Sequence, residues 1–251
     1  MHAPVELADI AADVLARIRE RGPRVHCITN SVAQQYTANM LLAAGAVPSM
    51  TIAPEEIAGF VAGADALLVN LGTFDAERRS AIDVALGALR ERPLPWVLDP
   101  VFIERSPVRA KFAVELAGLA PSVVRLNQAE FGALAGGNDP ARYAQSRATI
   151  VALTGDLDVV TDGERRVTIA NGDALMGLVT AMGCAGSALV CAALAVEPDA
   201  WLATIAALTA FGVAGEVAAQ NARGPGSFAG AIMDALHSLD RATLRARVKV
   251  S

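Results

Sequence analysis

Residues 180–196, TAMGCAGSALVCAALAV, combine a thiol with the predicted start of a helix. Small residues crowd a turn there, and Cys184 and Ser187 stand where a long Ala-rich helix without charges should begin. A helix start leaves about four backbone N–H groups without partners and carries roughly half a positive charge. Gly183 and Gly186 would let an anion approach this backbone closely. The segment therefore predicts an anion-binding helix start with a thiol at its opening.

Cys184 has two interpretations on position alone. A thiol at a helix N-terminus can have a lowered pKa and act chemically as a thiolate. A cysteine can also serve as a small buried hydrophobe, as Cys191 would seven residues later on the same helix face. Both interpretations remain open at this point.

Asp99 and Glu130 are two carboxylates that follow neighbouring predicted strands. Hard oxygen ligands of this kind, used one or two at a time with waters and phosphates, suit Mg²⁺. Under that interpretation, Glu130→Gln should lower turnover with little loss of stability. The alternative is that Asp99 caps a turn before Pro100, and that Glu130 completes a capping box in NQAE, which begins at Asn127.

Other nucleotide-binding motifs are missing from the sequence. It contains no GxxxxGK[ST] loop, and no GxGxxG follows a predicted strand. The commonest phosphate-binding and dinucleotide-binding folds are therefore excluded.

Short β-rich runs alternate with helical runs along the chain. The predicted strands are 25–29, 66–71, 96–98, 123–126 and 150–154, followed by a hairpin from Asp158 that turns at Asp162-Gly163. The predicted helices are an amphipathic N-terminal helix, 34–44, 54–62 and 76–90, and the chain is helical from the hairpin to about Asp240. This order predicts one α/β domain over residues 1–251, with a mostly parallel sheet covered by helices on both faces.

Polar residues follow the predicted strands at the point where each one ends. In open α/β sheets, ligands bind at the carboxyl ends of the strands. We therefore expect these groups to converge at one edge, beside the helix that starts near Cys184. The group comprises Thr29, Asn30, Asn70, Gly72, Thr73, Asp99, Asn127, Glu130, Thr154, Gly155 and Asp156.

Composition limits the partners of this chain. Its 251 residues carry a net charge of -5, which argues against a nucleic-acid partner. No charge falls between Asp173 and Glu197, yet that run and the one from Ala200 to Gly215 are rich in Ala and Gly. They lack the flanking bias of membrane spans, so buried helices explain them better. Three dispersed cysteines and a mixed-charge N-terminal helix predict a cytoplasmic protein without a disulfide framework.

The ordered motifs of this chain resemble those of the hydroxyethylthiazole kinase family, thiamine-salvage kinases of the ribokinase-like superfamily. The resemblance covers about Pro23 to Leu239 and includes several motifs in sequence order. These are HCITNSVAQQYTANMLLAAGAVPSM, LLVNLGT, LDPV, VVRLNQAE, VALTGDLDVVTDG, the Gly-Cys pair at the long helix, FGVAGE and GPGSF.

The resemblance implies a three-layer ribokinase-like fold and a specific reaction. ATP, with Mg²⁺, would phosphorylate the hydroxyl of 4-methyl-5-(2-hydroxyethyl)thiazole in a homotrimer whose sites lie between subunits. Asn30, Met50, Gly72 and Ala181 would contact the thiazole, and Arg125, Asn127, Thr154 and Asp162 would contact ATP. Asp99 and Glu130 would organise the metal and phosphates, while Gly183 and Cys184 would lie at the transferring phosphate, with Cys184 where many relatives carry an aspartate base.

The chain departs from the family pattern at three places. Ala181-Met182 stands where the family usually has Gly-Thr before Gly-Cys, and Phe102-Ile103-Glu104 replaces GAG of DPVGAG. Residues 136–148 predict a shortened crossover before the strand at 150. The departures keep two alternatives open: an impaired paralogue that binds a thiazole-like or thiamine-like ligand, or another ribokinase-like kinase or ATP-dependent dehydratase.

Overall fold

An eight-stranded sheet forms the centre of the computed structural model, which describes residues 3–251. Its order is β2-β1-β3-β4-β5-β6-β7-β8; the first six strands are parallel, and β7 and β8 are antiparallel to their neighbours. The strands are β1 Arg24–Ile28, β2 Val47–Ser49, β3 Ala66–Asn70, β4 Trp96–Asp99, β5 Val123–Asn127, β6 Ile150–Thr154, β7 Asp158–Thr161 and β8 Arg166–Ile169.

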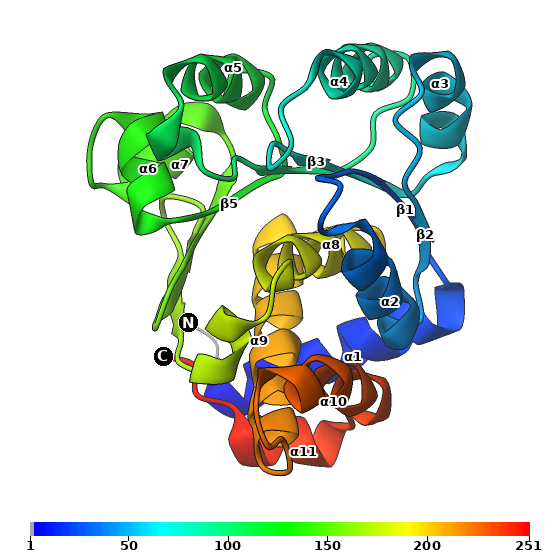
Figure 1. The fold of residues 1–251 in the computed structure, drawn as a ribbon. Coiled ribbons are helices and arrows are strands. Elements are labelled where there is room, and N and C mark those ends of the chain that lie inside the picture. Colours follow the sequence, from blue (N-terminus) through cyan, green and yellow to red (C-terminus); the bar gives the residue numbers. More distant parts are fainter. Residues whose placement is uncertain (1–2) are drawn as a thin grey trace.

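Helices cover both faces of this sheet, as Figure 1 shows. One layer holds α3 Pro54–Gly63, α4 Ala76–Ala88, α5 Pro107–Ala117, α6 Gln128–Ala135 and α7 Pro140–Arg147. The other layer holds α1 Pro4–Arg21, α2 Gln34–Ala44, α8 Met182–Leu194, α9 Ala200–Ala219, α10 Pro225–Ser238 and α11 Arg241–Arg247. Two short 3₁₀ helices, Ile103–Arg105 and Ala174–Leu178, complete the described elements. The expected three-layer α/β architecture is confirmed.

Local sequence explains most of these elements. Every residue of β3 is buried, as expected for a central parallel strand with helices on both faces. Helix α2 spans the predicted residues, ends at Ala44 and is capped by Gly45, whose φ of 95° lies in the left-handed region that favours glycine. The predicted hairpin also forms, with β7 and β8 in register from Asp158 opposite Ile169 to Thr161 opposite Arg166.

Strand β2 and helices α5 and α7 were absent from the sequence-based prediction. Strand β2 is only three residues long and contains Pro48, which a sheet tolerates at its edge. Helix α7 occupies the short crossover before β6, and the Asp139 side chain caps it by accepting from the Arg142 N–H. Neither β2 nor α7 has a long periodic pattern, so local sequence did not reveal these two short elements.

The two uncharged runs form helices α8 and α9 in the interior. Helix α9 is the one described helix whose length and composition would allow it to cross a membrane, and 78% of its most apolar window is buried by the protein. It lies against α1, α8 and α10. Contacts with other helices therefore account for its apolar composition.

Candidate active site

A buried polar network connects the carboxyl ends of β1, β3 and β4 to the start of α8. The Asn30 amide donates to Oδ1 of Asn70 at 3.1 Å, and the Asn70 amide donates to Oδ2 of Asp99 at 2.7 Å. From α8, the Ser187 hydroxyl donates to the same Asp99 oxygen at 2.8 Å. These side chains come from four separate segments, and all are buried. The structure thus brings Asn30 and Asp99 together at the predicted edge.

Cys184 belongs to this network, but its thiol differs from the reactive form considered above. The amides of Asn30 and Asn70 approach Sγ at 3.2 and 3.3 Å, respectively. Burial, followed by the nearby Asp99 charge, raises the pKa of Cys184 to about 11. The hypothesis of a lowered thiol pKa is therefore wrong for this structure, because desolvation outweighs the amide donors. At neutral pH Cys184 is a protonated thiol.

Asp99 is a buried carboxylate that accepts hydrogen bonds from the described side chains on only one of its two oxygens. Its pKa is raised, mainly by burial, although Arg125, Ser187 and Asn70 each favour the charged form. Both side-chain donors converge on Oδ2, and no residue in 3–251 donates to Oδ1. One oxygen is thus fixed by the protein while the other retains its capacity to bind a ligand.

Glu130 forms the predicted capping box and also supports a second loop. The Asn127 side chain accepts from the Glu130 N–H, and Oε2 of Glu130 accepts from the Asn127 N–H, both at 2.9 Å. Oε1 accepts from the Phe102 N–H at 2.9 Å. Burial, repulsion from Asp99 and repulsion from Glu104 raise the pKa of Glu130. The capping interpretation is therefore confirmed, and the same carboxylate lies in the electrostatic field of Asp99.

The pair Asp99 and Glu130 fits a Mg²⁺ ion. Residues 3–251 contain no group of three His, Cys, Asp or Glu side chains arranged around a metal position. Magnesium does not need one, since proteins hold it through one or two carboxylates with waters and substrate phosphates. Burial raises the pKa of both carboxylates, and repulsion from Asp99 further raises that of Glu130; a nearby cation would reverse these shifts.

Arg125 connects the polar network to the start of α8. Its Nη1 donates to the Gly183 carbonyl at 3.0 Å and reaches the Ser187 hydroxyl at 3.5 Å. A Cβ on Gly186 would lie 3.3 Å from Nη2 of Arg125 and 3.1 Å from the Phe211 ring. The glycine expected to admit an anion therefore makes room for Arg125 and Phe211.

Helix α8 begins at Met182, two residues before the predicted start at Cys184. The N–H groups of Gly183 and Cys184 consequently lie in its first turn, and within residues 3–251 they have no backbone acceptor. Free amides at a helix start bind anions. With the guanidinium of Arg125 beside them, they make this end of α8 electropositive.

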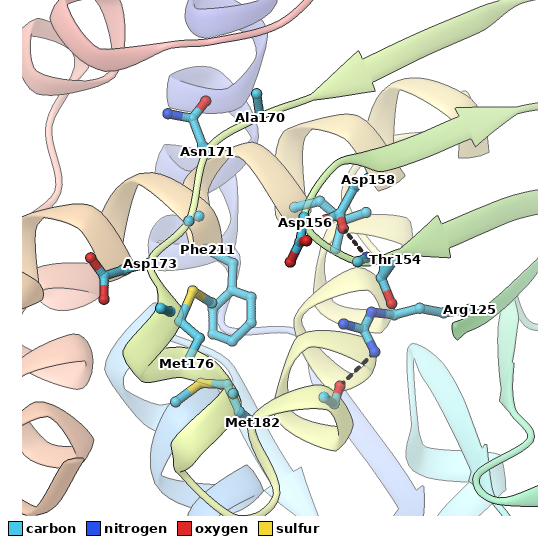
Figure 2. Close-up of a pocket in the computed structure, with 17 residues that line it drawn as sticks. Arg125, Thr154, Asp156, Asp158, Ala170, Asn171, Asp173, Met176, Met182 and Phe211 are labelled. Atoms are coloured by element: carbon cyan, nitrogen blue, oxygen red, sulfur yellow. Dashed lines mark hydrogen bonds between the residues drawn. The ribbon is translucent and has the colours of Figure 1, made fainter. Parts of the chain in front are cut away.

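A cavity of about 480 Å³ opens beside Arg125 at the carboxyl end of the sheet. Figure 2 shows Arg125, Thr154 and Asp158 on one side and Phe211, Met176 and Met182 on the other. The segments after β6 and β8, the start of α8 and the middle of α9 supply the walls. The cavity therefore has one charged end beside the polar network and one end that is apolar around Phe211 and the methionines, with Asp173 next to Met176.

Of the other residues predicted to contact the thiazole or ATP, one lines the cavity and the rest lie outside its lining. Thr154 lines the cavity, and Asn127 is its register partner on β5 but does not line it. A Cβ on Gly72 would lie 2.7 Å from Nδ2 of Asn30, so that close approach requires glycine. Met50 is half-buried directly after the edge strand β2.

Asp162 is not brought to this site. It lies after the antiparallel strand β7, where Thr161 is opposite Val151 near the amino end of β6. Its carboxylate accepts from Arg165, which also pairs with Asp199 at 2.6 Å. Because β7 runs antiparallel, its end reaches the edge opposite the cavity, so we leave Asp162 out of the proposed nucleotide site.

Sequence reasoning missed several cavity residues. Asp158, Asn171, Met176 and Phe211 all line the cavity. A signal existed for Phe211, which begins the FGVAGE motif, and for Asp158, which begins β7. Asn171 and Met176 lie in an irregular segment without a pattern, so only the folded chain reveals them.

Two departures from the family pattern fall on strained backbone. Phe102 and Ala181 have φ values of 58° and 71°, in the left-handed region where a side chain is disfavoured. These are positions where the resemblance leads one to expect glycine. Ala181 immediately precedes α8, and the Phe102 N–H is held by Glu130. The strain therefore lies in the two loops that border the polar network.

Ala181→Gly should stabilise the protein by about 1 kcal/mol, because glycine adopts this φ without strain. Turnover should rise several-fold, since a Cβ is removed beside the free amides of α8. Ala120→Gly is the matched control: Ala120 has a φ of 53° but precedes β5 at the opposite edge. It should give a similar stability gain without a change in rate. Denaturant unfolding measures the stability of both variants, and steady-state kinetics measures their turnover. Equal turnover in the two variants would contradict the expected effect of Ala181→Gly on turnover.

A family model, a relative and a solved structure all indicate the same family. The model of the hydroxyethylthiazole kinase family matches residues 15–142 and 139–242. A hydroxyethylthiazole kinase of Rhizobium leguminosarum is 45% identical, with 95% of this chain and 96% of that protein covered. The solved structure of a hydroxyethylthiazole kinase protein from Pyrococcus horikoshii superposes with a TM-score of 0.93 at 37% identity, covering 97% of this chain and 98% of that one.

A more distant structure supports the fold alone. A ribokinase-like superfamily protein from Enterococcus faecalis has a TM-score of 0.65 at 13% identity, covering 93% of this chain and 95% of that chain. The fold is therefore ribokinase-like. Because the family model and the relatives extend over nearly all of it, this chain belongs to the hydroxyethylthiazole kinase family.

Proposed function

We propose that this protein transfers the terminal phosphoryl group of ATP to the hydroxyl of 4-methyl-5-(2-hydroxyethyl)thiazole. The observation that carries the proposal is the junction of the Asp99 network with the free amides of α8 and Arg125, at the charged end of the cavity. A phosphoryl group placed there would contact donors on one side and the carboxylate pair on the other.

Each residue has a separate task in this reaction. The cavity takes the nucleotide, with its apolar end around Met176 and Phe211 suited to the base. Arg125 and the Gly183 and Cys184 amides stabilise negative charge on the transferring group. Asp99 and Glu130 would hold Mg²⁺, which would neutralise charge on the phosphates. Asn30, close to Gly72 and Cys184, contacts the thiazole alcohol, with Met50 and Ala181 as further contacts.

Cys184 serves as a hydrogen-bonding group to the substrate hydroxyl. With a pKa near 11, it holds its proton at neutral pH and does not act as a strong base. Phosphoryl transfer passes through a loose transition state, so positioning and charge stabilisation supply most of the catalysis. Losing general-base help still lowers the rate by about 10²–10⁴-fold. We therefore expect a slow kinase.

We also propose a cytoplasmic homotrimer with sites between subunits. The trimer follows from the family resemblance, and one feature of the surface supports it. Val32, two residues after Asn30, is 70% exposed, and Leu178 near the cavity is 66% exposed. Contact with another copy would remove these apolar groups from water. Sedimentation velocity of the purified protein tests the trimer.

ADP release tests the proposed reaction. Folded protein with ATP and Mg²⁺ should release ADP when the thiazole alcohol is added, and should do so more slowly with hydroxymethylpyrimidine and other alcohols. Omitting Mg²⁺ serves as the control and should abolish the release. Folded protein that releases no ADP above background when the thiazole alcohol is added would contradict the kinase assignment and favour a ligand-binding paralogue.

A further inference from the structure

The FGVAGE motif, residues 211–216 of α9, contacts the loop that follows β8. This loop, residues 170–177, forms one wall of the cavity. Phe211 faces the cavity directly in Figure 2, but the proposed reaction gives no role to the rest of the motif. Gly212, Gly215 and Glu216 of this motif contact the cavity wall, and Glu216 also contacts the C-terminal segment.

Two glycines of the motif allow the loop to lie directly on the surface of α9. A Cβ on Gly212 would come within 2.6 Å of the Asn171 carbonyl oxygen, and one on Gly215 within 2.6 Å of Sδ of Met176. Atoms do not approach so closely, so a side chain at either position would displace the loop or its methionine. Helix and loop therefore form one packed unit.

Glu216 anchors this unit through a single carboxylate oxygen. Its Oε1 accepts from the Asn171 side-chain amide at 2.9 Å, from the Gly172 N–H at 3.2 Å and from Nζ of Lys249 at 3.0 Å. The Glu216 side chain is only 11% exposed. A largely buried carboxylate that accepts from two points of one loop restricts the conformations of that loop.

The C-terminal segment provides a second anchor through Asn171. The Asn171 amide donates to the Arg247 carbonyl, and its Oδ1 accepts from the Lys249 N–H, both at 2.8 Å. In Figure 2 the Asn171 side chain points away from the centre of the cavity. Asn171 therefore faces α9 and the C-terminal segment, while its backbone contributes to the cavity wall.

We propose that Glu216 is a positioning residue that holds residues 170–177 in the shape that closes the nucleotide cavity, with residues 247–249 as the second anchor. The inference rests on the proposed function, because it assigns the cavity to the nucleotide. Glu216 itself does not line the cavity. Its effect on the reaction is therefore transmitted through the population of the closed loop, which scales the apparent affinity for nucleotide.

The test compares Glu216→Ala with Glu216→Gln and with Glu197→Ala. Glutamine retains an oxygen for Asn171 and Gly172 and loses only the charge opposite Lys249. Glu197 is a matched control: its side chain is 13% exposed and accepts from Arg17 at 2.6 Å, but it follows the far end of α8. For each folded variant we would measure the Kd for ADP by calorimetry, and KM for ATP and kcat with the thiazole alcohol.

Glu216→Ala should raise the Kd for ADP and the KM for ATP about ten-fold, with kcat within about two-fold, if the closed loop falls to roughly a tenth of molecules. Glu216→Gln should keep the Kd for ADP and the KM for ATP within about three-fold of the wild-type values. Glu197→Ala should lower Tm but leave both constants unchanged. If Glu216→Ala does not fold, Asn171→Ala, which removes the side chain held by both anchors, must still raise the Kd for ADP.

Each contrary result identifies what has failed. Equal nucleotide constants in wild type and Glu216→Ala overturn the positioning role while the kinase function stands. Weaker ADP binding by Glu216→Ala, in a protein whose wild type shows no thiazole-dependent turnover, supports the positioning role and overturns the proposed reaction. A wild type that binds no ADP overturns both.

Discussion

Asp99→Asn should lower thiazole-dependent turnover by about 10³-fold while leaving the protein folded, because it removes a charged ligand of the proposed Mg²⁺ ion that would neutralise the phosphates. The substitution fits the observed hydrogen bonds. The new carbonyl oxygen can take the place of Oδ2 and accept from Asn70 and Ser187, and the new amide can take the place of Oδ1, where no described residue donates. Removing a buried carboxylate whose pKa is raised should leave the free energy of unfolding unchanged or higher.

Steady-state kinetics, thermal unfolding and ADP calorimetry check this result. Asp65→Asn is the control: Asp65 pairs with Arg24 in a bridge whose side chains are 38% and 64% exposed, at the amino edge of the sheet. It should change neither turnover nor nucleotide affinity. Retention of turnover within ten-fold in Asp99→Asn would exclude a charge at this position from the reaction.

Glu130→Gln should lower turnover about 10²-fold and also destabilise the protein by about 1–3 kcal/mol. The sequence alone predicted little loss of stability, and the structure changes that expectation. The two carboxylate oxygens accept separately from the Asn127 and Phe102 N–H groups. Glutamine offers one oxygen, so its amide would face an N–H donor. The loop at Phe102, already at a φ of 58°, would lose its anchor.

A matched substitution separates stability from catalysis. Asp139→Ala removes the N-cap of α7, where the side chain accepts from the Arg142 N–H at 3.0 Å. It should lower stability by about 1 kcal/mol and leave turnover unchanged. Chemical denaturation and ADP release on both variants make the comparison. If Glu130→Gln loses stability but keeps its rate, Glu130 has only the capping role.

Gly183 and Gly186 illustrate what the sequence could predict and what it could not. Their presence at a helix start correctly indicated a close approach to that backbone. The sequence could not indicate which group approaches, and the structure places the Arg125 side chain against both positions. Arg125 lies on a strand some sixty residues earlier in the chain, so no local pattern relates it to α8.

The sequence by itself determined the alternation of strands and helices, the edge where polar residues gather, and the family. Buried strands and capped helices are local patterns, and parallel strands place their carboxyl ends together. Only the tertiary structure decided the state of Cys184, since a thiol pKa depends on burial and neighbouring charge from distant segments. It also excluded Asp162 from the cavity, because the antiparallel course of β7 carries that residue to the opposite edge.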